Sequence, residues 1–205
     1  MEAKIPGIWR KGDGYMYFVP DPINKPIQWK DKRIDVLLTD ASRLLGELNA
    51  YSTIVPDVDF FIKMHVIKEA TQSNKIEGTR ADVTDAVLPE DEVVAAKRDD
   101  WEEIHNYVSA MSYAITELQT LPLSLRLLKS THKILMSNVR GKEKQPGEIR
   151  HSQNWIRGTS PQDAVFVPPH HEEVQTLLSD LEKFWHNKDL PLPLLVKIAS
   201  WALPI

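Results

Sequence analysis

Apolar residues recur at helical spacing along most of this chain, and that pattern constrains the fold more than any other feature of the sequence. Prolines interrupt the pattern, since proline lacks the amide donor that a helix interior needs. Asp99 or Asp100, and later Ser124, are expected to cap helices. A short helix and a linker are expected between residues 79 and 98. The longer helices expected cover residues 31–55, 57–77, 99–121, 124–141, 170–187 and 194–202. We therefore expect a mainly α fold.

The second of these helices ends in the stretch Thr71-Gln-Ser-Asn-Lys-Ile-Glu-Gly-Thr-Arg80. Gly78 is expected to stop the helix, because glycine adopts the left-handed conformation of a helix C-terminus without a Cβ penalty. Ser73 and Glu77 are four residues apart and therefore share one face of the last turn. A helix C-terminus carries partial negative charge. Glu77 is therefore either a solvated side chain or one held for a cationic partner.

Residues 146–169 differ from the helical remainder of the chain. Two short apolar stretches, which end at Ile156 and at Val167, flank the turn-rich loop 157–163. This pattern predicts a β-hairpin. A lone hairpin on a helical body would leave strand edges free to pair with another chain. An irregular surface loop is the alternative that the residues alone leave open.

Residues 1–29 combine prolines with aromatic residues. Because proline fixes φ and lacks an amide donor, we expect neither a long helix nor a central strand in this segment. It is predicted to be an extended arm whose aromatic side chains lie on the body of the protein, and a proline-rich ligand for another domain is the alternative. The aromatic residues are Trp9, Tyr15, Tyr17, Phe18 and Trp29.

Composition excludes several function classes. The net charge is −4, so no excess of basic charge argues for a nucleic-acid partner. Cysteine is absent, which rules out disulfides, thiol catalysis and cysteine-ligated zinc. The N-terminus lacks the apolar segment of a signal peptide, and no apolar run is long enough for a bilayer. We therefore expect a cytoplasmic protein without a membrane partner.

The run His170-His171-Glu172-Glu173 invites interpretation as a metal site. Neighbouring residues on a helix point about 100° apart, so the two imidazoles would not chelate from one face as an i, i+4 pair does. We expect no metal ligand here. A hydrated helix start, at which Glu172 and Glu173 are favourable, is the expected structure.

The stretch Ser73-Asn-Lys-Ile-Glu77-Gly78 resembles the inhibitory motif of Fic/DOC family proteins, in which Ser or Thr is followed, after three residues, by Glu and then Gly or Asn. The resemblance implies a protein adenylyltransferase, which transfers AMP from ATP to a hydroxyl of a target protein. It also implies that Glu77 pairs with an arginine of the ATP-binding site and obstructs productive placement of the γ-phosphate. Ser73 and Gly78 would shape the helix end.

The later segments look like the same family. The predicted hairpin is similar to the family's flap, which clamps a target segment by main-chain pairing, and the last two helices look like those that lead into the active-site loop. The resemblance thus implies a Fic-like helical bundle with one protruding β-hairpin. Residues 1–98 would form an N-terminal arm and inhibitory-helix region, and residues 99–205 an incomplete Fic core. The flap residues that would dock the target are Asn154, Trp155, Ile156, Gly158, Val165, Phe166 and Val167.

The chain departs from the family at the catalytic signature, His-Pro-Phe-x-Asp/Glu-Gly-Asn-Gly-Arg. Neither a His-Pro pair nor Gly-Asn-Gly occurs in the 205 residues. The histidine that takes the proton of the target hydroxyl and the turn that cradles phosphates are therefore missing, and no catalytic residue is assigned. We expect a chain truncated before its chemistry, which transfers no AMP and holds no cofactor alone, although the intact family uses ATP and Mg²⁺.

Two alternatives accompany this interpretation. The chain is either a non-catalytic binding module that inhibits a Fic core in trans, as separate antitoxins do, or a non-functional remnant whose apolar face over residues 194–203 lacks its cover. The expected partners are a target protein docked by the flap, a Fic core in trans, or a second copy of the chain in a homo-oligomer.

Overall fold

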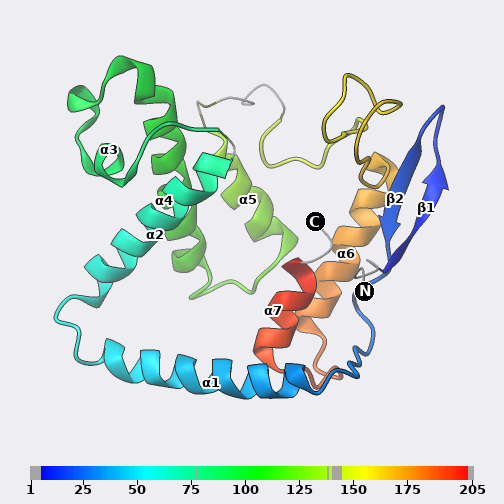
Figure 1. Cartoon of the computed structure of the whole chain (residues 1–205), viewed down its shortest axis with the longest axis horizontal. Helices are drawn as coiled ribbons and strands as arrows, with labels where there is room; N and C mark the ends of the chain where they lie inside the picture. The colour runs from blue at the N-terminus through cyan, green and yellow to red at the C-terminus, as the bar shows by residue number, and fades with distance from the viewer. Residues whose placement is uncertain (1–5, 77, 138, 140–144, 203–205) are drawn as a thin grey trace. The chain divides into compact units, whose positions relative to one another are not determined.

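The computed structural model describes residues 6–76, 78–137, 139 and 145–202. This part of the chain forms seven α-helices, two short 3₁₀ helices and one two-stranded antiparallel sheet (Figure 1). The predicted mainly α class with one β-hairpin is therefore confirmed. None of the described helices combines the length and the apolar character needed to cross a membrane.

Contacts group the chain into two compact units, one of residues 1–43 with 149–205 and one of residues 44–148. Helix α1 (Arg33–Ser52) runs across this division and lies within the predicted helix 31–55. The boundary predicted between residues 98 and 99 falls at the start of α4 (Arg98–Glu117), inside the second unit. A grouping by contacts does not test the division into a regulatory region and a core, so that boundary stays a prediction.

The first unit begins with a hairpin of β1 (Gly7–Lys11) and β2 (Met16–Pro20). The strands are antiparallel, and the turn between them closes where the amide of Gly12 donates to the carbonyl of Tyr15 over 2.8 Å. The arm predicted for residues 1–29 is therefore a hairpin over much of its length. Its prolines lie at or outside the strand ends, where the ladder needs no amide donor.

Polar contacts join this hairpin to α6 (His171–His186) within the same unit. Arg10 Nη1 of β1 forms a 2.7 Å ion pair with Glu173 Oε1. The hydroxyl of Tyr17, on β2, donates to the same carboxylate oxygen over 3.3 Å. The chain of this unit ends in α7 (Leu194–Ala202). Glu173 thus receives one contact from each strand and fixes the face of the hairpin that lies on α6.

Residues 149–169, for which a free-standing flap hairpin was predicted, contain one isolated antiparallel bridge, between Ile156 and Phe166. The amide of Ile156 donates to the carbonyl of Phe166 over 2.8 Å, and the amide of Phe18 on β2 donates to the carbonyl of Val167 over 2.9 Å. The prediction is corrected in two respects. The pairing inside the flap is a single bridge, and the edge at Val167 is joined to the N-terminal hairpin.

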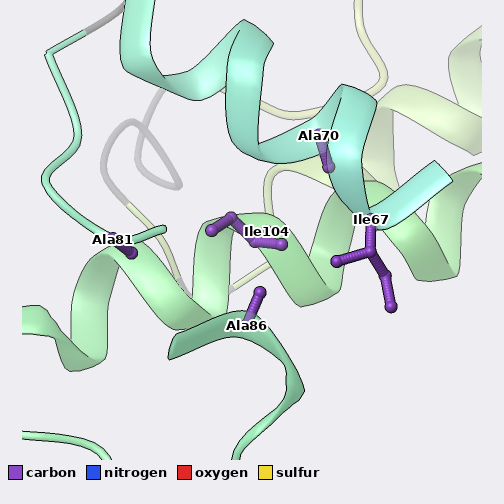
Figure 2. Packing of buried hydrophobic residues seen from close by; sticks show 5 residues of the cluster. All are labelled: Ile67, Ala70, Ala81, Ala86 and Ile104. Atoms are coloured by element: carbon purple, nitrogen blue, oxygen red, sulfur yellow. The ribbon is translucent and has the colours of Figure 1, made fainter. Parts of the chain in front are cut away.

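The second unit is helical, and its helix α4 contacts both α2 (Val58–Ile76) and α5 (Leu125–Leu135) (Figure 1). Buried Ile67 and Ala70 of α2, Ala81 and Ala86 from the next segment, and Ile104 of α4 form its apolar cluster (Figure 2). Small side chains let the backbones approach closely around the one large residue of α4. The remaining elements are α3 (Val83–Val87) and the 3₁₀ helices Glu90–Glu92 and Ala95–Lys97.

Two predicted helix caps had different outcomes. Ser124 caps α5, and its side chain accepts a 3.3 Å hydrogen bond from the amide of Leu127. The prediction for α4 is wrong, because Lys97 occupies the cap position without a side-chain cap bond. Asp100 instead accepts the amide of Arg80 over 2.6 Å. The carboxylate that the sequence pattern assigned to the start of α4 thus binds a backbone amide from another segment.

Candidate functional site

Helix α2 ends in a Schellman motif. Gly78 has a φ of 96°. Its amide donates to the carbonyl of Lys75 over 3.1 Å, and the amide of Thr79 donates to the carbonyl of Asn74 over 3.1 Å. These are the two bonds of a Schellman motif whose left-handed residue is Gly78. Gly78 is therefore the helix stop that its conformational freedom predicts.

The turns that precede this motif are anchored on α4. Ile67 and Ala70 are buried in the cluster that contains Ile104 (Figure 2). Thr71 is fully buried, and its hydroxyl donates to the carbonyl of Ile67 over 2.8 Å, so its polar atom is satisfied inside the helix. The last two turns of α2 therefore have a defined place on α4.

Ser73 and Gly78 lie together at this helix end. The Ser73 hydroxyl donates to Glu69 Oε1 over 3.0 Å, one turn back along the helix. Glu77, the predicted inhibitory residue, lies outside the described residues. Asn74 Nδ2 and Thr79 Oγ1 are buried and have no hydrogen-bond partner in the described part of the chain. The inhibitory role of Ser73, Glu77 and Gly78 stays a prediction.

A groove of ≈ 350 Å³ runs along the same pair of helices. Its lining is mostly apolar and contains no lysine or arginine, so it suits apolar side chains better than phosphate groups. Burial, and to a smaller extent the charge of Glu69, raises the pKa of Tyr107, so the phenol stays protonated at neutral pH. The lining residues of α2 and α4 are Phe61, Ile62, His65, Val66, Glu69, Tyr107 and Met111.

The flap residues predicted to dock a target differ in exposure. Trp155, Ile156 and Val165 are exposed, whereas Val167 is only 3% exposed. The carbonyl of Asn154 already accepts a 2.9 Å hydrogen bond from the side chain of Gln153. Target docking stays a prediction for the whole set, and the exposed apolar members are its best candidates for side-chain contacts.

Asp163 organises the loop between the two paired flap positions. Its carboxylate accepts hydrogen bonds from the amides and hydroxyls of Thr159 and Ser160 at 2.7 to 3.1 Å. Gly158 has a φ of 82°, and a Cβ at this position would lie 2.7 Å from the carbonyl oxygen of Asp163. The tight turn therefore depends on the glycine and on the carboxylate together.

The four donors also set the charge state of this loop. The Thr159 amide first, then the hydroxyls of Ser160 and Thr159 and the Ser160 amide, hold the pKa of Asp163 far below its ordinary value. A depressed carboxyl pKa stabilises the folded loop above the ordinary value of about 4, and this contribution is lost as the pH falls through the folded value. The loop is therefore expected to keep this stabilisation unchanged from pH 7 to pH 5.

We expect Asp163→Asn to raise the amide exchange rates of Thr159 and Ser160 on the order of tenfold, because a charged acceptor is replaced by a neutral one. The wild-type protection factors should be equal at pH 7 and pH 5. Asp40→Asn, at an exposed position of α1, is the matched control. Equal protection in wild type and Asp163→Asn would contradict the conclusion that this carboxylate orders the loop.

The two neighbouring histidines lie closer together than helical spacing predicts. His170 is the residue before α6, with φ −59° and ψ 145°, and only His171 lies on the helix. Their ring centroids are 4.1 Å apart, and ligand atoms of both and of Glu172 lie within 4.8 Å of one another. The spacing argument against a metal site is therefore wrong for this pair. The positive end of the helix still opposes a cation there, and the absence of a metal stays a prediction.

A family model described as Fic/DOC family N-terminal matches residues 36–116. The matched span contains all of α2, the Schellman motif at Gly78 and nearly all of α4. This match supports a Fic/DOC family protein. No curated protein matches the chain. The family's catalytic signature does not occur in the 205-residue sequence. That the chain alone holds neither ATP nor Mg²⁺ stays a prediction.

Sequence interpretation did not identify two residues that shape the flap of this chain. Asp163 follows Thr159 and Ser160 at the spacing of a side-chain-capped turn, and that local pattern could have indicated its role. Phe18 has no such signal, because its partner Val167 is far away in the sequence. Only the fold brings these two residues together.

Proposed function

We propose that this Fic/DOC protein supplies the regulatory and target-docking part of a protein adenylyltransferase, and that its 205 residues do not transfer AMP alone. The observation that supports this proposal is the fixed end of α2. The Schellman motif at Gly78 lies inside the region matched by the Fic/DOC N-terminal model. The buried side chains of α2 hold that end on α4.

A fixed helix end is what an inhibitory carboxylate requires. A carboxylate and a guanidinium form two parallel hydrogen bonds only when their planes and distances match. Glu77 would bind the arginine of a Fic core in this way and deny it to the γ-phosphate of ATP. The Ser73–Glu69 hydrogen bond and the left-handed Gly78 would set the direction in which the chain leaves the helix.

The absence of AMP transfer is tested with the purified chain, α-labelled ATP and Mg²⁺. We expect no label on the chain or on added proteins, because the signature that would accept the proton of a target hydroxyl and cradle the phosphates does not occur in the sequence. Chain-dependent labelling of any protein would contradict the proposal.

The inhibitory role is tested by calorimetric binding to a Fic core from which its own inhibitory helix has been removed. We expect Glu77→Gln to weaken binding tenfold or more, because the buried arginine of the core would keep its charge and lose its anionic partner. Glu117→Gln is the matched control, since this glutamate also ends a helix. Equal affinities of the wild type and Glu77→Gln would contradict the inhibitory role of Glu77.

A non-functional remnant is the second candidate. Leu194 and Ile198 of the apolar helix α7 are both exposed, and this favours a face that lacks its cover. Such a chain should associate or aggregate in solution. A monodisperse sample that melts cooperatively would count against the remnant.

A further inference from the structure

The N-terminal hairpin and the flap form one hydrogen-bonded assembly within the first unit. β2 pairs with β1 on one side. On its other side, the amide of Phe18 donates to the carbonyl of Val167 over 2.9 Å. The neighbouring carbonyl of Phe166 faces the opposite way and accepts the amide of Ile156 over 2.8 Å. Residues 165–167 therefore lie between β2 and Ile156.

Aromatic side chains strengthen this junction. The ring of Trp9 on β1 lies 5.5 Å from the ring of Phe18 and 6.0 Å from that of Phe166, and both pairs are edge-to-face. Phe18 and Phe166 are 6.2 Å apart. Edge-to-face pairs at such distances are attractive beyond the area that they bury. Trp9 is thus the one side chain of β1 whose ring contacts both β2 and the flap.

A third contact lies at the tips of the two loops. Gln162 of the flap loop donates from Nε2 to the carbonyl of Asp13 in the turn of the hairpin, over 3.2 Å. The hairpin therefore meets the flap through a main-chain bond, a group of three rings and a loop-to-loop bond. These contacts join segments that are remote in the sequence.

Asp163 holds the loop of the flap, but strand pairing within the flap is sparse. Its pairing is the single bridge between Ile156 and Phe166. The exposed fractions of Ile156 and Val165 are 55% and 71%, so neither side chain contributes much buried area. Even a complete isolated hairpin is only marginally stable in water. The order of the strand positions 156 and 165–167 therefore depends on what lies beside them, and in the described part of this unit the N-terminal hairpin bonds to them through Phe18 and Val167.

We propose that the N-terminal hairpin is the positioning element of the flap and that Trp9 is its positioning residue. Trp9 holds Phe166 against Phe18 and so fixes the register in which Val165 and Ile156 face a docked strand. Capture of an extended target segment then depends on residues 7–18 as well as on the flap itself. The part that concerns target capture rests on the proposed docking function, whereas the ordering of the flap does not.

Hydrogen exchange of the full 205-residue chain tests this ordering. We expect Trp9→Ala to raise the exchange rates of the Ile156, Val165 and Phe166 amides about tenfold or more, because two ring pairs are lost. Trp9→Phe keeps an aromatic ring and should restore protection to within about threefold of the wild type. Rates in Trp9→Ala within about twofold of the wild type would overturn the proposal.

Ile8→Ala is the matched control for Trp9→Ala. Ile8 is 52% exposed and Trp9 is 53% exposed, but Ile8 lines the groove against α6 and does not face the flap. Its replacement should leave flap exchange unchanged, and an equal loss of protection in both variants would overturn the role of Trp9. The amide of Ile104 in the other unit reports in the same experiment whether the fold is intact.

If Trp9→Ala lowers protection at Ile104 as well, the loss is not specific to the flap. Gln162→Ala then tests whether the hairpin orders the flap. It removes only the bond to Asp13 at an exposed site, and exchange at Val165 should then rise about threefold; an unchanged rate would overturn the proposal. No partner is present in these measurements. They therefore decide the ordering independently of whether Glu77 binds a Fic core, and a failure of that binding would not affect them.

Discussion

Replacing Ile104 by alanine is expected to lower the free energy of unfolding by about 3–4 kcal/mol. The side chain is fully buried between α2, α3 and α4. Three of its four buried neighbours, Ala70, Ala81 and Ala86, are small, so they cannot extend into the space that the deletion leaves. A cavity that cannot collapse adds its own cost to the lost transfer free energy, which places the variant in the upper part of the usual range.

Urea titration followed by circular dichroism measures this loss, provided that the dependence of the free energy on urea is unchanged. Ile115→Ala is the control, because Ile115 lies on the same helix and is 49% exposed; we expect it to cost below about 1 kcal/mol. A loss of less than about 1 kcal/mol in Ile104→Ala would show that α2 is not anchored where the structure places it. Ile104→Ala should also weaken any binding that depends on the end of α2.

Phe184→Ala is expected to destabilise the first unit by about 3–5 kcal/mol. Phe184 is fully buried on α6, and the ammonium of Lys197 on α7 lies 5.9 Å from its ring centroid. Removal of the ring leaves a void at the buried residue of α6 and ends the contact with Lys197. The helix that carries Glu173, the anchor of the N-terminal hairpin, loses its main apolar support.

The same titration measures Phe184→Ala, with amide exchange of α6 as the local probe. Phe60→Ala removes an equal ring from a position that is 62% exposed, and we expect it to change stability by less than about 1 kcal/mol. Similar losses in the two variants would mean that Phe184 is not the centre of packing for this unit.

Local signals in the sequence predicted the end of α2 and the start of α5. Gly78 was placed correctly because a left-handed helix end favours glycine over every other residue. Ser124 was placed correctly because a hydroxyl at a helix start satisfies an amide that has no other partner. Both rules depend on only a few neighbouring residues. The mainly α class followed in the same way from the spacing of apolar residues.

The sequence patterns did not predict interactions between segments that are distant in the chain. The carboxylate of Asp100 is used by the amide of Arg80 and not by its own helix end. The carbonyl of Val167 is used by Phe18, so the flap is not a lone hairpin. The turn at Asp13-Gly14 is a known hairpin signal, yet the surrounding prolines favoured an arm. In each case the stabilising interaction is made with a residue that the local spacing of the sequence does not identify.

The histidine pair shows the limit of spacing rules at an element boundary. The 100° rule applies to residues that are both helical, and His170 is not. One residue of uncertainty in a helix start was enough to change the predicted geometry of the side chains. Site predictions at helix termini therefore need the observed backbone angles.

Inhibition in trans tests the central proposal most directly. A Fic core without its own inhibitory helix is supplied with α-labelled ATP, and its self-labelling is followed while this chain is added in increasing amounts. The proposal predicts that the wild-type chain and Glu117→Gln suppress labelling and that Glu77→Gln does not, because only Glu77 would occupy the arginine that orients the γ-phosphate. Undiminished labelling in the presence of saturating wild-type chain, or equal suppression by Glu77→Gln, would contradict it.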